Sequence, residues 1–213
     1  MEFWVLAGVP ATSFIVALSG ALMPGPLLTV TVGEVARRGF WAGPLIIVGH
    51  ALLELALVLL ILAGVGAWLH RPAILGLVGV LGAVMLGWMG LAMMRASRHS
   101  HLEFDSQAQS GLHPVLAGVL LSLANPYWLL WWVTIGLGYV MFSAKYGLPG
   151  VALFYVGHIL ADFVWYSLVS GAVAQGRRFL SDRIYQGFLA CCGFFLVGFG
   201  GYFGFQGVKF LLG

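Results

Sequence analysis

Two pairs of ionisable residues stand out because each lies inside a long apolar stretch of the sequence. His50 is followed four residues later by Glu54, and His158 is followed four residues later by Asp162. This spacing places both side chains of a pair on one face of a helix, within reach of each other. An imidazole beside a carboxylate can hold and release a proton near neutral pH, and both groups also bind divalent metal ions. These four residues are therefore the candidate chemical centre.

Three roles are open to these residues. In the first, Glu54 and Asp162 carry a coupling proton with the help of His50 and His158, since burial disfavours a charged carboxylate and a neighbouring imidazolium favours it. In the second, two nitrogen and two carboxylate ligands bind a divalent metal such as Mn²⁺, Zn²⁺ or Fe²⁺. In the third, the pairs are structural hydrogen bonds that tie helices together.

The composition indicates what kind of protein holds these residues. Of 213 residues, 61% are hydrophobic and 8% are charged, whereas a soluble domain carries about 25% charged residues. This excludes an ordinary soluble enzyme, a nucleic-acid binder and a disordered chain. The long apolar runs favour helices over barrel strands, which alternate apolar and polar residues over about ten positions. We predict an all-α integral membrane protein, with no cofactor and no enzymatic motif.

Six segments are apolar enough, and long enough at about 20 residues or more, to cross a bilayer as helices. They are Val9–Gly33, Gly43–Trp68, Ala73–Met94, Pro114–Phe142, Pro149–Ala174 and Gly187–Leu212. The first four residues lack the basic region of a secretory signal, so we expect the first segment to remain a span.

The cations between these segments predict the orientation. Seven of them fall in the connectors after the first, third and fifth segments: Arg37, Arg38, Arg95, Arg98, Arg177, Arg178 and Arg183. The opposite side has three, which are Arg71, Lys145 and Lys209. Because Lys and Arg are enriched on the cytoplasmic side, we predict a multi-pass protein of the cell membrane with both termini on the non-cytoplasmic side.

The two halves of the chain resemble each other. Val48-Gly49-His50 in the second segment matches Val156-Gly157-His158 in the fifth, and both are followed by an acid at the same distance. The glycine-rich third segment likewise matches the sixth. Three spans used twice must place the second copy upside down, because three is an odd number. We predict a first repeat at residues 1–96, a cytoplasmic connector at 97–113 and a second, inverted repeat at 114–213, with a site near the midplane between them.

Prolines predict breaks in the first and fourth segments. Pro24-Gly25-Pro26 removes two amide donors from the first, and Asn125-Pro126, with Ser122 nearby, interrupts the fourth. Such breaks persist in a membrane only beside protein or a watery cavity, and each new half-helix N-terminus suits a substrate carboxylate. A simple kink without ligand contact is the alternative. We predict that these residues bind substrate together with Tyr155 and Tyr166, which extend the polar face of the fifth segment.

The segment Ser19–Pro26, with the sequence SGALMPGP, and the segment Arg38–Gly43, with RGFWAG, resemble the LysE/RhtB family of amino-acid exporters. The resemblance covers almost the whole chain, and it implies a six-helix exporter of amino acids or similar small solutes driven by proton exchange. By position, the family's Pro-Gly-Pro falls on Pro24, Gly25 and Pro26, and its Asn-Pro falls on Asn125 and Pro126. The family often has Lys after Asn-Pro, whereas this chain has Tyr127, which removes one potential carboxylate anchor.

The expected function is therefore a secondary transporter whose partners are a small-molecule substrate, protons and the lipid bilayer, without nucleic acid. The alternative is a divalent metal-ion exporter that uses His50, Glu54, His158 and Asp162. Gly200 and Gly204 form a small-residue face that suits either a homodimer or packing within the chain.

Overall fold

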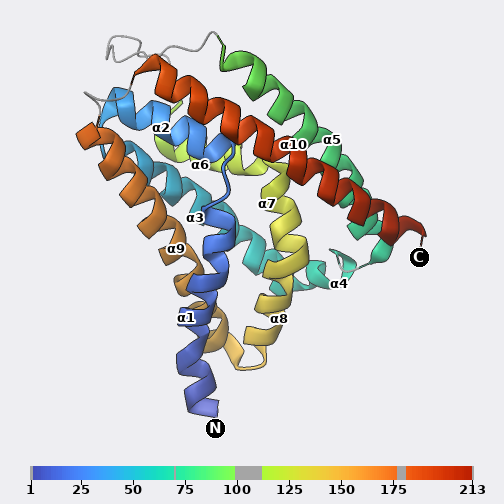
Figure 1. Ribbon diagram of the computed structural model, residues 1–213. Helices are drawn as coiled ribbons and strands as arrows, with labels where there is room; N and C mark the ends of the chain where they lie inside the picture. The colour runs from blue at the N-terminus through green and yellow to red at the C-terminus, as the bar shows by residue number, and fades with distance from the viewer. Residues whose placement is uncertain (1, 70, 99–111, 177–180, 213) are drawn as a thin grey trace.

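In the computed structural model, the described residues form helices and no strands (Figure 1). The structure describes residues 2–69, 71–98, 112–176 and 181–212. The helices are α1 (Glu2–Ala21), α2 (Pro26–Arg38), α3 (Ala42–Leu60), η1 (Ile61–Val65), α4 (Gly66–Leu69), α5 (Pro72–Ala96), α6 (Pro114–Leu123), α7 (Pro126–Trp131), η2 (Trp132–Gly136), α8 (Leu137–Ala144), α9 (Gly147–Gly176) and α10 (Asp182–Leu212). The all-α prediction is confirmed. Most of the predicted connector, residues 99–111, and the cations Arg177 and Arg178 lie outside the described residues.

Five helical stretches within the described residues are long and apolar enough to span a membrane, and the bent pair α1–α2 brings the number up to six. The five are Ala42–Val65, Pro72–Ala96, Pro126–Ala144, Gly147–Gly176 and Asp182–Leu212. The predicted fourth segment is two separate pieces. Its first part, α6, has 10 residues, which is half of what a crossing needs, and the crossing stretch begins only at Pro126.

Prolines determine where several helices begin. Pro26, Pro72, Pro114 and Pro126 each lie in the first turn of a helix, where the missing N–H has no intrahelical partner to lose. Between α1 and α2 the chain bends by 82° at the Pro-Gly-Pro segment. A further turn occurs at Gly64, which the sequence did not single out. Its φ of +108° is open mainly to glycine, and it redirects the chain from η1 into α4.

Two helix crossings bring backbones into direct contact through glycine. α3 packs against α6, where Gly49 faces the carbonyl of Val115 and Gly118 faces the carbonyl of Ile46. α9 packs against α1, where Gly157 faces the backbone of Pro10. A Cβ atom at any of these three glycines would overlap backbone atoms. The glycines therefore set the distance at which α3 and α9 approach the first halves of the two broken spans.

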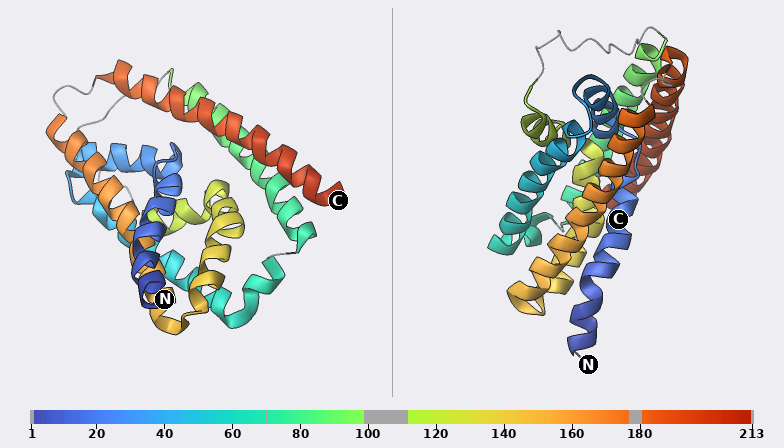
Figure 2. Two further views of the ribbon diagram at one scale, coloured as in Figure 1. Left: turned by 60° about the horizontal axis from the view of Figure 1, so that its bottom comes forward. Right: turned by 90° about the vertical axis from the view of Figure 1, so that its left-hand side faces the viewer.

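The α5–α10 pair stands beside the other helices, and its two members run alongside each other over most of their length (Figure 2). A Cβ atom at Gly79 of α5 would lie 2.7 Å from Cα of Gly207 in α10. Gly200 and Gly204 both lie against Ala83 of α5. The small-residue face of α10 is thus used for packing within the chain.

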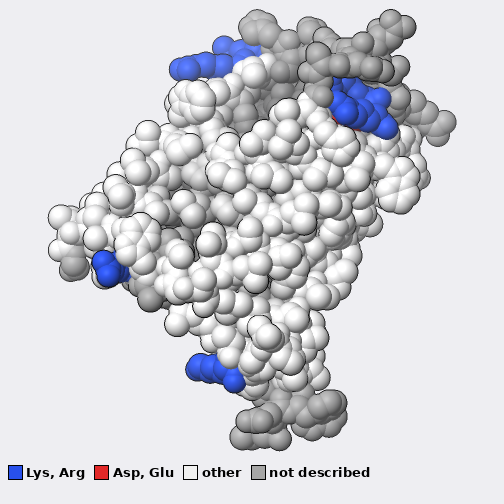
Figure 3. All heavy atoms as spheres, turned by 180° about the vertical axis from the view of Figure 1, so that it is seen from behind, with Lys and Arg blue, Asp and Glu red and all other residues white. Residues whose placement is uncertain are grey.

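Charged residues gather at the ends of the helices. Arg37 and Arg38 lie in the last turn of α2, Arg95 lies in the last turn of α5, and Arg183 follows the first residue of α10. These three helix ends lie together at the top of Figure 1. Seen from behind, Lys and Arg occupy the margins of the molecule and a broad uncharged band separates them (Figure 3). Such a band is what the hydrocarbon core of a bilayer requires.

The crossing of α3 and α6 can be tested at Gly118. Gly118→Ala should destabilise the protein by about 1–3 kcal/mol, the usual cost of overpacking, because the added methyl group meets the Ile46 carbonyl. The measurement is thermal unfolding in detergent. The control is Gly138→Ala in α8, where nothing lies within 4 Å and alanine, the better helix former, should leave stability equal or slightly higher. Equal stability of the two variants would contradict the close crossing.

Candidate functional site

A small polar cavity lies where the two broken spans meet α3 and α9. Its walls come from α1, α2, α3, α6, α7 and α9, and its volume is about 50 Å³. A water molecule needs about 10–15 Å³ of such space, so the cavity has room for a few waters. All four predicted ionisable residues line it: His50, Glu54, His158 and Asp162. The fold thus brings both His–acid pairs to one place.

Glu54 is the centre of the cluster, and its residue surface is only 2% exposed. Its Oε1 accepts hydrogen bonds from the indole Nε1 of Trp128 at 3.0 Å and of Trp132 at 2.7 Å. The Nε2 of His50 lies 3.1 Å from the same oxygen, and the Nε2 of His158 lies 2.8 Å from Oε2. Four nitrogens therefore surround one carboxylate, which is how a protein compensates the desolvation of a buried charge.

The hydrogen bonds of His50 fix where its protons lie. The Ser122 hydroxyl has one proton, and it donates this proton to the Gly118 carbonyl at 2.7 Å. The His50 Nδ1, which is 2.7 Å from the Ser122 Oγ, must therefore be the donor in that contact. A second proton lies between His50 Nε2 and Glu54 Oε1, since two bare acceptors would repel each other at 3.1 Å. Together His50 and Glu54 form a charge-assisted pair.

His158 lies in an aromatic surround. Its ring centroid is 4.8 Å from that of Trp131, 5.4 Å from that of Trp132 and 5.8 Å from that of Phe154. Its Nδ1 is buried without a hydrogen-bond partner among the described residues. The ring is thus held by one hydrogen bond to Glu54 and by packing against aromatic side chains.

Asp162 differs from Glu54 although it lies in the same cavity. Its Oδ2 is 4.0 Å from His50 Nε2 and 3.9 Å from His158 Nε2, both too long for hydrogen bonds. The residue is 5% exposed, and one turn further along α9 Tyr166 also lines the cavity. Asp162 is thus a buried carboxylate held by no direct donor among the described residues.

The helices that begin after the two proline breaks differ in how their N-termini are capped. At the start of α7, the Asn125 side chain caps the helix by accepting from the Tyr127 N–H at 3.1 Å. At the start of α2, Gly25 is the N-cap and no side chain caps the helix. Gly25 and Leu27 both line the cavity. The N-terminus of α2 therefore has amide groups that no side chain caps, whereas at the N-terminus of α7 the Asn125 side chain caps the Tyr127 amide.

The structure separates the predicted substrate residues into two groups. Gly25, Ser122, Asn125 and Tyr166 line the cavity together with the four ionisable residues. The remaining four are not part of its wall: Pro24, Pro26, Pro126 and Tyr155. The three prolines create the breaks in the helices. The Tyr155 hydroxyl donates to the Ala51 carbonyl at 2.8 Å and so connects α9 to α3.

Trp128 and Trp132 were missed by the sequence reasoning. Their spacing of four, directly after the Asn-Pro break, places both indoles on one helix face and could have indicated a pair of donors. A buried tryptophan N–H usually has a hydrogen-bond partner, and Glu54 on the second predicted segment is an acceptor for both indoles.

Comparison with known proteins bears on this architecture. The family profile described as "LysE type translocator" matches residues 18–207. The chain belongs to the LysE type translocator family.

Three relatives are similar in sequence to this LysE-type translocator. The putative amino acid efflux protein YcgF of Bacillus subtilis is 24% identical over 201 residues, which cover 93% of this chain and 96% of the relative. The leucine efflux protein of Klebsiella pneumoniae is 30% identical over 142 residues, covering 62% of this chain and 63% of the relative. The chemotactic transduction protein ChpE of Pseudomonas aeruginosa is 25% identical over 181 residues, covering 84% and 88%. No solved structure matches the chain.

Family membership and the apolar helices make this LysE-type translocator a multi-pass membrane transporter. The family resemblance drawn from Pro24-Gly25-Pro26 and Asn125-Pro126 is confirmed.

The role of the indoles can be tested at Trp132. Trp132→Phe removes a buried donor to Glu54 and should lower stability by about 1–3 kcal/mol, the cost of leaving a buried polar group short of a partner. Trp165→Phe is the matched control, because the Trp165 N–H is buried without a hydrogen-bond partner among the described residues, and its removal should cost less. The measurement is thermal unfolding of both purified variants in detergent. Equal losses would show that the bond to Glu54 contributes nothing.

Proposed function

We propose that this LysE-type translocator exports amino acids across the cell membrane by proton antiport through the polar cavity. The observation that carries the proposal is the convergence of two interrupted spans and four buried ionisable side chains on one cavity. Interrupted helices beside a watery cavity are typical of substrate sites in secondary transporters. The names of the relatives from Bacillus subtilis and Klebsiella pneumoniae support amino acids as the substrate.

We propose further that residues 1–96 and 114–213 are inverted repeats joined by the connector 97–113. Gly49 and Gly157 hold the same position in the two Val-Gly-His elements. Gly49 packs against α6, which begins the second broken span, and Gly157 packs against α1, which begins the first. Each copy of the element thus contacts the opening helix of the other half. A pseudo-two-fold axis between the halves would produce this exchange.

Within this mechanism, Glu54 and Asp162 have different tasks. Glu54 is surrounded by four nitrogens from α3, α7, η2 and α9, so removing or adding a proton there would disturb the whole cluster. Asp162 faces the same cavity without a direct donor, and water or a substrate ammonium group can reach it at little cost to the rest. Asp162 is therefore the group that binds either the coupling proton or the substrate ammonium group. Glu54, His50 and His158 keep their charges and surround it.

The substrate carboxylate would bind at the start of α2. This N-terminus has no capping side chain, and its amides with the helix dipole favour an anion. Asp162 and Tyr166 lie on the wall contributed by α9 and suit the ammonium group. Such a site recognises the two charges shared by all α-amino acids.

The metal-export alternative is less well supported. Ligand atoms of His50, Glu54 and Asp162 lie within 4.8 Å of one another, which is close enough for a cation to collect them. Both Glu54 oxygens, however, already accept hydrogen bonds, and both His50 nitrogens are engaged. A metal ion would have to displace these contacts and leave two indole donors beside a cation.

For the orientation, we propose that the ends of α2 and α5 and the start of α10 face the cytoplasm, since they carry Arg37, Arg38, Arg95 and Arg183. Both termini then lie on the non-cytoplasmic side.

The coupling role is tested by Asp162→Asn. The variant should insert and fold with near-wild-type thermal stability and should lose amino-acid transport driven by a pH gradient in proteoliposomes. Glu54→Gln should lose this transport as well, and it should also unfold at a lower temperature, because it removes the negative charge that four nitrogens surround. Unchanged pH-dependent transport by Asp162→Asn would remove Asp162 from the coupling role.

The metal alternative has its own measurement. Thermal unfolding of the purified protein with added Mn²⁺, Zn²⁺ or Fe²⁺ should show no saturable stabilisation. A saturable rise that His50→Ala abolishes would favour metal export instead.

A further inference from the structure

A second, larger cavity lies on the other side of α7. This apolar crevice has a volume of about 490 Å³ and lies between the α5–α10 pair and the stretch from α7 to η2. Val78 of α5 and Phe199, Phe203 and Phe210 of α10 are among its walls. Among the described residues that line it, none is charged, and the polar contributions come from side chains such as Thr134 and Gln206. The crevice therefore suits a large, neutral, apolar group.

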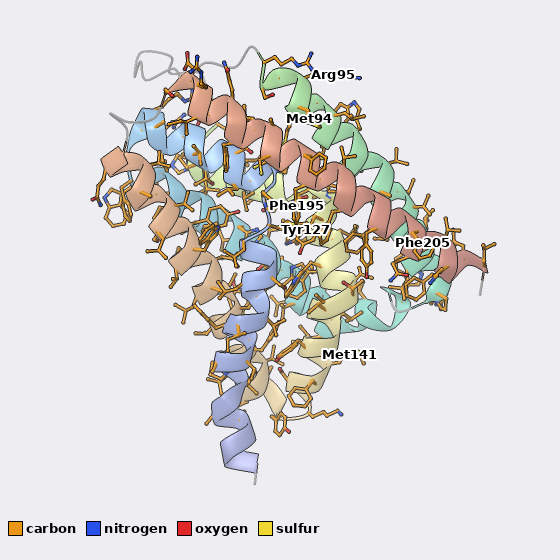
Figure 4. All side chains as sticks on the ribbon, viewed as in Figure 1. Met94, Arg95, Tyr127, Met141, Phe195 and Phe205 are labelled. Atoms are coloured by element: carbon orange, nitrogen blue, oxygen red, sulfur yellow. The ribbon has the colours of Figure 1, made fainter. Side chains whose placement is uncertain are left out.

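The crevice and the polar cavity share part of a wall. Tyr127 and Trp131 line both of them. The Tyr127 hydroxyl donates to the Ser19 carbonyl at 3.1 Å, and the Trp131 indole donates to the Ser19 hydroxyl at 3.1 Å. Figure 4 shows Tyr127 in the middle of the molecule, where α7 begins. Two neutral hydrogen bonds to a single residue at the end of α1 thus hold this partition in place.

The two volumes differ in what they can accept. Ligand sites for small molecules usually have volumes of about 300–1,000 Å³. The polar cavity, at about 50 Å³, has space for charged groups and a few waters but not for a bulky side chain. The crevice has that space, and it begins directly behind the shared wall.

We propose that the apolar crevice is the side-chain subsite of the transporter, and that its substrates are neutral amino acids with large aliphatic or aromatic side chains. The charged end of the substrate occupies the polar cavity, and the side chain enters the crevice when Tyr127 and Trp131 swing away from Ser19. This assignment rests on the proposed function, because it takes the polar cavity to be the site for the ammonium and carboxylate groups.

The first test narrows the crevice. Val78→Phe and Thr134→Phe place extra bulk on opposite walls. Each should lower the ratio of leucine flux to alanine flux in proteoliposomes by roughly tenfold or more, the range in which apolar pockets discriminate side chains. The matched control is Val84→Phe, the same substitution at a position of α5 that is 67% exposed, and it should keep the wild-type ratio. An unchanged ratio in both crevice variants would overturn the assignment.

The second test asks what occupies the crevice. Thr134→Cys, in a background carrying Cys191→Ala and Cys192→Ala, provides a single thiol for labelling by a small methanethiosulfonate reagent. Leucine should slow this labelling and alanine should not. Equal labelling with and without leucine would show that leucine does not occupy the crevice. Absence of any amino-acid flux in the wild type would overturn the proposed function, whereas flux with no leucine protection overturns only the side-chain subsite.

Discussion

The burial of one carboxylate is the constraint on which the centre of this protein depends. A carboxylate placed in a nearly water-free site is costly unless donors replace its hydration. The donors for Glu54 come from Trp128, Trp132 and His158 in addition to His50 on its own helix. These residues lie on α3, on α7 and η2, and on α9. Three spans must therefore adopt fixed depths and rotations so that four nitrogens meet two oxygens.

The two broken spans bring the ends of helices, with their backbone polar groups, to the cavity. Pro24 and Pro26 end α1 and start α2 beside the cavity, and Pro126 does the same between α6 and α7. Close glycine contacts at Gly49, Gly118 and Gly157 hold α3 and α9 against the opening helices of the broken spans. The helix ends at the breaks and the charged side chains of α3 and α9 consequently lie at the same cavity, although they are far apart along the chain.

A single aromatic wall divides the interior into two chemically different spaces. On one side of Tyr127 and Trp131 lie the ionisable groups, and on the other side lies the apolar crevice. Both side chains are bonded to Ser19 by neutral hydrogen bonds, which are about half as strong as charge-assisted hydrogen bonds such as those of Glu54. In the proposed transport cycle this partition is the movable part, and the carboxylate cluster is the fixed part.

Local features of the sequence were sufficient for the helical architecture. Apolar run length predicted the spans, because a helix in lipid must satisfy its own backbone, and prolines predicted the breaks near residues 24 and 125. The spacing of four placed His50 beside Glu54, because helical periodicity is a local property. The sequence did not reveal the turn at Gly64, the shortness of α6, or the indoles that bind Glu54.

Only the tertiary structure decided that His158 bonds to Glu54 across the bundle while its helical neighbour Asp162 stays free of direct donors. Which atoms meet across a helix interface depends on crossing angle, depth and rotation, and no spacing within one segment encodes these quantities. The sequence thus determined which groups are buried in the membrane, and the packing of the helices determined which of those groups are held and which are left to react.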